Sequence, residues 1–323
     1  MHCAVLGAGS WGTSLAVLLA RNGTRVSLWG RDSQLINEIH STRKNEKYLP
    51  GIELPKEISP CLEISEPVDF WIIAVPSAGL REAFSHLPSE SCQVIIATKG
   101  LESATSLRAS EVLEEVRPDL VPAVLSGPNL AFEIVKGIPT ATVIASKHNN
   151  LAESTRELFM CRTFRVYTSY DVVGVELGGA LKNVLAVGAG VCEGLGFGQN
   201  TKGAMLARGL KEIASLGVAC GAELRTFMGI SGVGDIFATA SSNLSRNYRL
   251  GKLLAEDKTL DTALLELGQV AEGAPTSKAV IELSERLNIE TPLMEAIYKV
   301  IYGAIKPMDA VINLMERMPK EEL

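Results

Sequence analysis

A glycine-rich hexapeptide near the N-terminus restricts the fold of this chain more than any other feature. Residues 7–12 read GAGSWG, which fits the pattern G-x-G-x-x-G. They directly follow an apolar run, Cys3–Leu6, and directly precede a helical pattern, Ser14–Arg21. In such a strand–loop–helix unit the first glycine permits a tight turn, the second lets a pyrophosphate approach the backbone, and the third lets helix and strand pack closely. We therefore expect a dinucleotide site at Gly7, Gly9 and Gly12.

The end of the second expected strand bears on the choice of cofactor. A site built for NAD alone carries an acidic residue about 20 residues after the glycines. Here the strand Arg25–Trp29 is followed by Gly30, Arg31 and Asp32. Arg31 stands where a 2′-phosphate would lie, which indicates that NADPH is accepted, while Asp32 leaves room for NADH. A solvated surface arginine is the alternative interpretation of Arg31.

The first half of the chain continues to alternate short apolar runs with helical patterns. This alternation predicts a Rossmann-type, doubly wound parallel sheet with helices on both faces. The further strands expected are Phe70–Val75, Val94–Thr98, Ala123–Ser126 and Thr142–Ala145. The further helices expected are Gln34–Ser41, Ala78–His86, Ser106–Val116 and Leu151–Phe159.

The pattern changes near Tyr170. Residues 172–219 contain no convincing strand and are dense in glycine and alanine, which predicts long, closely packed, buried helices. Further helices are expected at Ala255–Leu267, Thr276–Leu287 and Pro292–Tyr302. We therefore predict two domains, an α/β dinucleotide-binding domain at 1–170 and an all-α substrate domain at 171–323, with a cleft between them.

Composition narrows the class of partner. The net charge of −6 argues against nucleic acid or an anionic membrane as the main partner, because both need a basic face. The six cysteines form no CxxC or Cys/His cluster, so we expect reduced thiols and neither zinc nor disulfides. The uncharged stretch Met1–Ala20 has glycines in its apolar part and no basic residue before that part, unlike a signal peptide or membrane span. A cytoplasmic protein is expected.

Four polar residues lack an obvious structural partner in the sequence. Lys99 follows the strand Val94–Thr98, and ligands bind at the carboxyl ends of strands in open α/β sheets. Lys182 lies in a helix of small apolar residues with no carboxylate at helical spacing, and Asn183 is beside it. Burial would lower the pKa of such a lysine into a useful range. Asp235 likewise has no basic residue within four positions, although it could simply cap a helix that begins at Ile236.

A polar tripeptide, Ser245-Arg246-Asn247, is expected on a loop of the helical half. Its hydroxyl, guanidinium and amide groups are suited to holding a phosphate through charge-assisted hydrogen bonds. Alone, the tripeptide would be weak evidence of a site.

Taken together, these segments resemble the bacterial-type NAD(P)-dependent glycerol-3-phosphate dehydrogenases over essentially the whole chain. The resemblance rests on eight motifs in order: GAGSWG (7–12), YLPG (48–51), ATKG (97–100), SGPNLA (126–131), ELGGALKN (176–183), GVGD (232–235), SRN (245–247) and VAEG (270–273). It implies reversible hydride transfer between NADPH or NADH and dihydroxyacetone phosphate, giving sn-glycerol 3-phosphate for phospholipid synthesis.

The resemblance also implies roles for individual residues. Lys182 would be the catalytic acid/base, oriented by Asp235, with Lys99 helping to hold substrate and cofactor. Bacterial members often carry a hydroxyl residue where Asn129 stands here, although an amide can also bond the substrate. The residues expected to contact substrate are Lys99, Gly127, Asn129, Lys182, Asn183, Asp235, Ser245, Arg246 and Asn247. Those expected to contact the cofactor, besides the three glycines, are Ser10, Trp11, Arg31, Tyr48, Lys99, Ala131, Arg246, Val270 and Glu272.

The chemistry implied is acid/base catalysis without a metal. As hydride reaches the ketone carbon, Lys182 would stabilise the developing charge on oxygen and donate a proton. Two alternatives remain open: a related dehydrogenase acting on 6-phosphogluconate or a 3-hydroxyacyl substrate, or a non-catalytic NADPH-sensing module. Apolar helices in the second half favour a homodimer.

Overall fold

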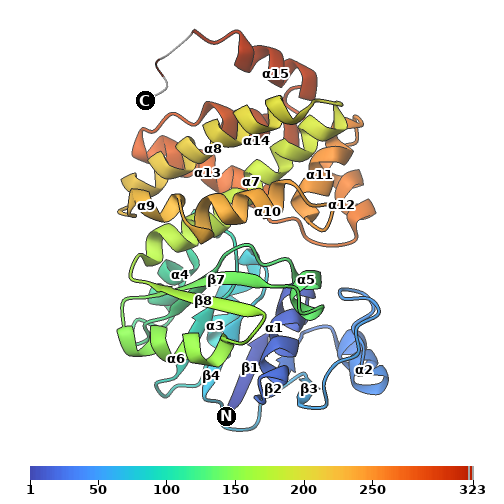
Figure 1. Cartoon of the computed structure of the whole chain (residues 1–323), viewed down its shortest axis with the longest axis vertical. Coiled ribbons are helices and arrows are strands. Elements are labelled where there is room, and N and C mark those ends of the chain that lie inside the picture. Colours follow the sequence, from blue (N-terminus) through green and yellow to red (C-terminus); the bar gives the residue numbers. More distant parts are fainter. Residues whose placement is uncertain (319–320, 322–323) are drawn as a thin grey trace.

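The computed structural model describes residues 1–318 and 321 and has two layered halves (Figure 1). The blue-to-green half contains the whole sheet, and the yellow-to-red half contains only helices. The two meet along one broad junction, with the N-terminus and helix α15 (Pro307–Met315) at opposite ends of the molecule. The expected fold class, a Rossmann-type α/β half followed by an all-α half, is confirmed.

A single eight-stranded sheet forms the middle of the first half, in the order β3-β2-β1-β4-β5-β6-β7-β8. The expectation of a parallel sheet is wrong at one junction, because β6 and β7 pair antiparallel, with Ser126 opposite Val143. The residues that join them, 127–139, contain only the one-turn helix α5 (Ala131–Val135), whereas parallel strands are usually joined by a longer helix that crosses the sheet. The strands are β1 (His2–Leu6), β2 (Arg25–Trp29), β3 (Ile58–Cys61), β4 (Phe70–Ile73), β5 (Gln93–Ile96), β6 (Ala123–Ser126), β7 (Thr140–Ser146) and β8 (Phe164–Ser169).

The two strands that the sequence did not predict, β3 and β8, are the two edges of the sheet. Both edge strands contain exposed or half-buried residues, so neither forms the continuous apolar run that marks the central strands. β8 alternates buried and exposed residues at its start, and β3 contains Pro60, which an edge strand tolerates.

Helices cover both faces of the sheet, and successive side chains of β1 show why. Val5 packs with Leu15 and Ile39 on one face, whereas Leu6 packs with Leu80 and Phe84 on the other. Both side chains are fully buried, as expected for a doubly wound sheet. The helices of the first face are α1 (Ser10–Arg21), α2 (Ser33–Thr42), α5 and α6 (Asn149–Phe159), and those of the second are α3 (Leu80–Ser85), preceded by the 3₁₀ turn η1 (Ser77–Gly79), and α4 (Ala109–Val116).

Helix α7 (Val172–Gly194) is the core of the second half. It is apolar enough to cross a membrane by length and composition, with a mean hydropathy of 1.4, but 89% of that window is buried inside the protein. The helix expected at Ala255–Leu267 ends where predicted but begins only at Leu260, because α11 ends at Ala255 and Thr259 caps a new helix. Around α7 lie α8 (Gln199–Ala219), α9 (Leu224–Phe227), the π-helical turn η2 (Ile230–Gly234), α10 (Asp235–Ala240), α11 (Arg246–Ala255), α12 (Leu260–Leu267), α13 (Gly273–Leu287) and α14 (Pro292–Ile301).

The close crossing of α7 and α11 yields a stability prediction. A Cβ atom at Gly190 would lie 2.0 Å from the carbonyl oxygen of Tyr248, so Gly190→Ala forces two buried helices apart. We expect a loss of about 1–3 kcal/mol in the free energy of unfolding, measured by urea titration. The control is Gly203→Ala on α8, where a Cβ meets nothing within 4 Å and the better helix former adds up to about 1 kcal/mol. Equal effects of the two substitutions would contradict the packing argument.

Candidate active site

A cleft of about 540 Å³ lies at the junction of the two halves. Its walls come from the carboxyl ends of the central strands on one side and from α7, α10 and α11 on the other. Three residues expected in the site do not line it: Gly12 and Gly127, which support the loops around it, and Asp235, which lies behind two lysines. The expected residues that do line it are Gly7, Gly9, Ser10, Trp11, Arg31, Tyr48, Lys99, Asn129, Ala131, Lys182, Asn183, Ser245, Arg246, Asn247, Val270 and Glu272.

The glycine loop has the geometry that an anion needs. Gly9 is the N-cap of α1 and no side chain bonds the free N–H groups of the first turn. A Cβ at Gly12 would lie 1.9 Å from the carbonyl oxygen of Gly7, whereas one at Gly9 would meet nothing within 4 Å. The loop is thus closed towards the protein and open towards the cleft, and an uncapped helix N-terminus attracts a phosphate. These residues fit the pyrophosphate of a dinucleotide.

The outer end of the same wall carries Arg31. Its side chain is 77% exposed, and its guanidinium is held only by a 3.8 Å contact with Glu82. Asp32 is engaged elsewhere: its carboxylate accepts the backbone N–H of Leu35 as the N-cap of α2, which lowers its pKa, and lies 3.6 Å from Lys47. The exposed cation is therefore free to meet an anionic group of a ligand.

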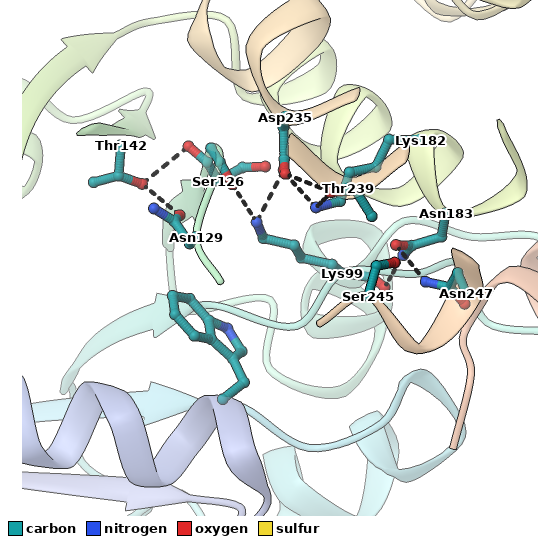
Figure 2. Close-up of polar contacts among 12 residues, drawn as sticks. Lys99, Ser126, Asn129, Thr142, Lys182, Asn183, Asp235, Thr239, Ser245 and Asn247 are labelled. Atoms are coloured by element: carbon teal, nitrogen blue, oxygen red, sulfur yellow. Dashed lines mark hydrogen bonds and ion pairs between the residues drawn. The ribbon is translucent and has the colours of Figure 1, made fainter. Parts of the chain in front are cut away.

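At the inner end, three charged groups converge from both halves (Figure 2). Asp235 of α10 bonds the Lys182 ammonium group through Oδ1 and the Lys99 ammonium group, at 2.9 Å, through Oδ2. Lys182 also donates to the hydroxyl of Thr239 at 2.8 Å, and Lys99 to the carbonyl of Gly127 at 2.7 Å. The partner that Lys182 lacks along its own helix is thus supplied by α10.

Burial decides how this cluster behaves. Lys182 is 6% exposed and Asp235 is not exposed at all. Removal from water lowers the pKa of Lys182 to about 7 from its ordinary 10.5; Asp235 opposes the shift and the positive charge of Lys99 adds to it. Lys182 can therefore both donate and accept a proton near neutral pH.

Close backbone contact brings the aspartate to this position. A Cβ at Gly178 of α7 would lie 2.5 Å from the carbonyl oxygen of Ser231, so α7 and η2 meet only because that residue is glycine. The π-helical turn η2 then delivers Asp235 as the first residue of α10. The alternative that Asp235 merely caps a helix beginning at Ile236 is wrong, because Gly234 is the N-cap and Asp235 lies inside α10.

The tripeptide at residues 245–247 was expected on a loop, but the structure places it at the start of α11. Ser245 is the N-cap and its hydroxyl accepts the N–H of Tyr248, which has no partner within the helix, so Ser245 stabilises the start of α11. Asn247 bonds Asn183 at 2.8 Å and accepts the N–H of Gly273 at 2.9 Å. Among the residues that the structure describes, Arg246 has no hydrogen-bond or ion-pair partner, and burial lowers its pKa while Glu272 opposes the shift. A half-buried guanidinium beside the free N–H groups of a helix N-terminus is suited to an anion.

Two further contacts shape the cleft. Glu272 accepts both the N–H and the hydroxyl of Ser77, at 3.1 and 2.7 Å, and so ties α13 to the end of β4. Burial raises the pKa of Glu272. Asn129 donates to the carbonyl of Ala141 at 3.2 Å and accepts from Thr142 at 3.0 Å, so its amide is held by β7.

Sequence reasoning missed Thr239 and Ser77 as residues of the cleft. Thr239 lies one helical turn after Asp235, so its spacing alone could have placed both on one helix face. Ser77 follows the carboxyl end of β4, the position where ligand contacts gather in such sheets. No pattern in the sequence could have paired Ser77 with Glu272.

Comparisons with known proteins agree along the whole chain. Family models described as the N-terminus and the C-terminus of NAD-dependent glycerol-3-phosphate dehydrogenase match residues 2–152 and 171–312. The chain is 43% identical over 327 residues to glycerol-3-phosphate dehydrogenase (NAD(P)+) of Carboxydothermus hydrogenoformans, covering 99% of the chain and 97% of that relative. The chain is also 46% identical to glycerol-3-phosphate dehydrogenase (NAD(P)+) of Thermoanaerobacter sp., covering 100% of the chain and 99% of that relative. The crystal structure of glycerol-3-phosphate dehydrogenase from Coxiella burnetii superposes with a TM-score of 0.94 at 34% identity, covering 98% and 99%.

The charge cluster yields a pH-dependent prediction. Asp235→Asn leaves two ammonium groups without a counter-charge, so Lys182 adapts by losing its proton and its pKa falls further below 10.5. The unfolded chain keeps that proton, so the variant regains stability as pH rises. We expect a loss of about 3–5 kcal/mol at about pH 5.5 and a smaller loss at about pH 8.5, from urea titrations beside the wild type. The same loss at both pH values would contradict the coupling.

Proposed function

The chain belongs to the NAD-dependent glycerol-3-phosphate dehydrogenase family, and we propose that its cleft reduces dihydroxyacetone phosphate to sn-glycerol 3-phosphate, reversibly, with Lys182 as the acid. It is an oxidoreductase of NADH or NADPH, in keeping with its relatives. Nothing in the comparisons favours the hydroxy-acid dehydrogenase or the cofactor sensor.

The observation that carries the proposal is the buried Lys182 on the cleft wall, held by Asp235 and Thr239. Burial also lowers the pKa of this lysine, to about 7. Lys182 lies on the helical wall of the cleft that also contains the glycine loop and the Arg246 guanidinium group. An oxyanion needs a proton donor, a phosphate needs a cation, and a dinucleotide needs an open helix N-terminus. One cleft holds all three groups.

The reduction follows from these positions. When bound, the reduced nicotinamide supplies a hydride to the ketone carbon of the substrate. The Lys182 ammonium group stabilises the charge that develops on the ketone oxygen and transfers its proton there; in the reverse direction the neutral amine accepts the hydroxyl proton. Asp235 and Thr239 fix the direction of the Lys182 ammonium group, and Lys99 adds a second positive charge.

We assign the substrate phosphate to Arg246 at the start of α11. Its charge and the unpaired N–H groups of that helix turn both favour an anion. Binding the phosphate there positions the carbonyl group by interactions remote from the reacting atoms. The remaining substrate contacts are assigned to Lys99, Asn129, Asn183, Ser245 and Asn247. Gly127 and Asp235, which do not line the cleft, are assigned to hold the Lys99 ammonium group behind the substrate.

We assign the opposite wall to the cofactor. The glycine loop with Ser10 and Trp11 receives the pyrophosphate, and Arg31 receives the adenosine ribose with its 2′-phosphate. Trp11 is held rigid because its indole N–H donates to the carbonyl of Ala97 at 2.8 Å. The other cofactor contacts are assigned to Tyr48, Lys99, Ala131, Arg246, Val270 and Glu272.

Three broader assignments belong to the same proposal. We divide the chain at residues 170/171, between β8 and α7, a position in the gap between the two family-model matches. A homodimer is supported by exposed apolar side chains along residues 224–237, from α9 through η2 to α10: Leu224, Met228, Val233 and Phe237. A cytoplasmic location is supported by six cysteines that are all free.

Lys182→Met tests the function and the acid together. Wild-type protein should consume NADPH when dihydroxyacetone phosphate is added. The loss of absorbance of the reduced cofactor measures this consumption. The variant keeps an apolar stem of similar length and loses the proton and the charge. General acid catalysis and charge stabilisation are both removed, so kcat should fall by at least about 10³.

Thermal melts and NADPH titration of the same samples are the controls. A folded, cofactor-binding variant that retains more than about a tenth of wild-type turnover would exclude Lys182 as the acid. In the wild type, reduction requires the ammonium form and should slow as pH rises through about 7, while oxidation of sn-glycerol 3-phosphate should accelerate. A wild type without turnover would overturn the proposed function itself.

Arg31→Glu tests the choice of cofactor. A carboxylate repels a 2′-phosphate but can bond a 2′-hydroxyl group, so the Kd of NADPH should rise far more than that of NADH. Fluorescence titration with each cofactor measures both values. Arg25→Glu is a matched control, since Arg25 is also exposed but lies at the opposite end of β2 from Arg31, where it pairs with Glu66. Equal weakening of both cofactors by Arg31→Glu would show that Arg31 does not discriminate.

A further inference from the structure

A buried asparagine outside the assigned site holds the glycine loop in place. Asn45 has no exposed surface, although it lies in the connection between α2 and β3. We infer that Asn45 positions the pyrophosphate-binding loop and thereby sets the affinity for both nicotinamide cofactors. The inference rests on the proposed function, because it names a positioning residue for the same cofactor site.

The Asn45 amide group makes three of the four hydrogen bonds open to it. Its nitrogen donates to the carbonyl oxygen of Ala8 at 2.9 Å and to the hydroxyl of Thr13 at 2.8 Å. Its oxygen accepts the N–H of Tyr48 at 3.3 Å. One side chain therefore joins the glycine loop, the first turns of α1 and the segment that carries Tyr48 into the cleft.

The bond to Ala8 fixes the direction of a group that faces the cofactor. A peptide unit is planar and trans, so the carbonyl oxygen of Ala8 and the N–H of Gly9 point in opposite directions. Asn45 draws the carbonyl oxygen into the protein, which turns the N–H of Gly9 towards the open side of the loop, where Gly9 lines the cleft. A peptide plane turned the other way would present a carbonyl oxygen to a phosphate.

Only an amide serves all three partners. Two of the partners, Ala8 and Thr13, receive N–H bonds from one nitrogen, while Tyr48 needs an acceptor. An aspartate accepts but cannot donate when ionised, and it would place a negative charge against the carbonyl oxygen of Ala8. The same charge would oppose the pyrophosphate.

The segment beyond Asn45 is fixed through the same residue. The backbone carbonyl of Asn45 accepts the N–H groups of Tyr48 and Leu49, at 3.2 and 2.7 Å, and closes a turn there. Tyr48 reaches the cleft from this turn. Asn45 thus sets the distance between Tyr48 and the glycine loop, the two sides between which a dinucleotide would lie.

The experiment is calorimetric titration of Asn45→Asp with NADP+ and NAD+, without substrate. Both Kd values should rise at least about tenfold near pH 8, because a donor is lost and a charge is gained. The two cofactors share the pyrophosphate, so the rise should be similar for both, unlike the effect of Arg31→Glu. At about pH 5.5 the buried carboxyl group regains a proton and can donate one bond, so the gap from the wild type should narrow.

Asn22→Asp is the matched control. Asn22 also donates to two carbonyl oxygens, those of Leu158 and Phe159, but at the far end of α1. This control should leave both Kd values within about twofold of the wild type. Thermal melts establish that each variant is folded. If Asn45→Asp does not fold, Asn45→Ala takes its place, with a rise of at least about threefold expected from the lost bonds.

Three results would overturn the inference: Kd values within about twofold of the wild type in a folded Asn45 variant, weakening confined to one cofactor, or equal weakening by Asn22→Asp. The measurement is independent of turnover. A wild type that binds cofactor but does not reduce dihydroxyacetone phosphate would refute the proposed function and leave the role of Asn45 standing.

Discussion

The buried contact between Lys182 and Asp235 is the interaction on which the rest of the site depends. Burying two charges costs several kcal/mol per ion before their attraction is counted, so such a pair is poor as a device for stability alone. Here the cost leaves Lys182 with a pKa of about 7. The sequence around the pair serves that end: Gly178 lets η2 touch α7, and the turn then places Asp235 behind the lysine. Side chains larger than glycine would move the aspartate away.

The same aspartate joins the two halves of the molecule. Its second carboxylate oxygen bonds Lys99, which follows the sheet strand β5, while its first bonds Lys182 on α7. A second tie between the halves, Glu272 with Ser77, lies across the same cleft. Asp235 is fully buried and Glu272 partly buried, so both ties that hold the two walls together are made by carboxylates at the cleft itself. The contact that positions Lys182 therefore also helps to hold the two halves of the molecule together.

Sequence patterns predicted those parts of the structure whose environment is uniform. Central strands such as Phe70–Ile73 are covered on both faces and appear as continuous apolar runs, whereas β3 and β8 are half-covered edges without such a run. Residues with unusual burial, Lys182 above all, could be singled out because no local partner explained them. Residues that act by holding others, such as Thr239, Ser77 and Asn45, have ordinary sequence surroundings. Their partners are distant in the chain, so only the folded structure pairs them.

The two ends of the cleft differ in a way that bears on how such a site can change. Arg31 is largely exposed and held by one long contact, so a substitution there disturbs little else in the protein. Lys182, Asp235 and Thr239 share bonds and burial, so a change in one alters the charge or position of the others. Cofactor preference is therefore the property that single substitutions can alter at small cost in stability. The proton-transfer chemistry is fixed by a cluster whose members can change only together.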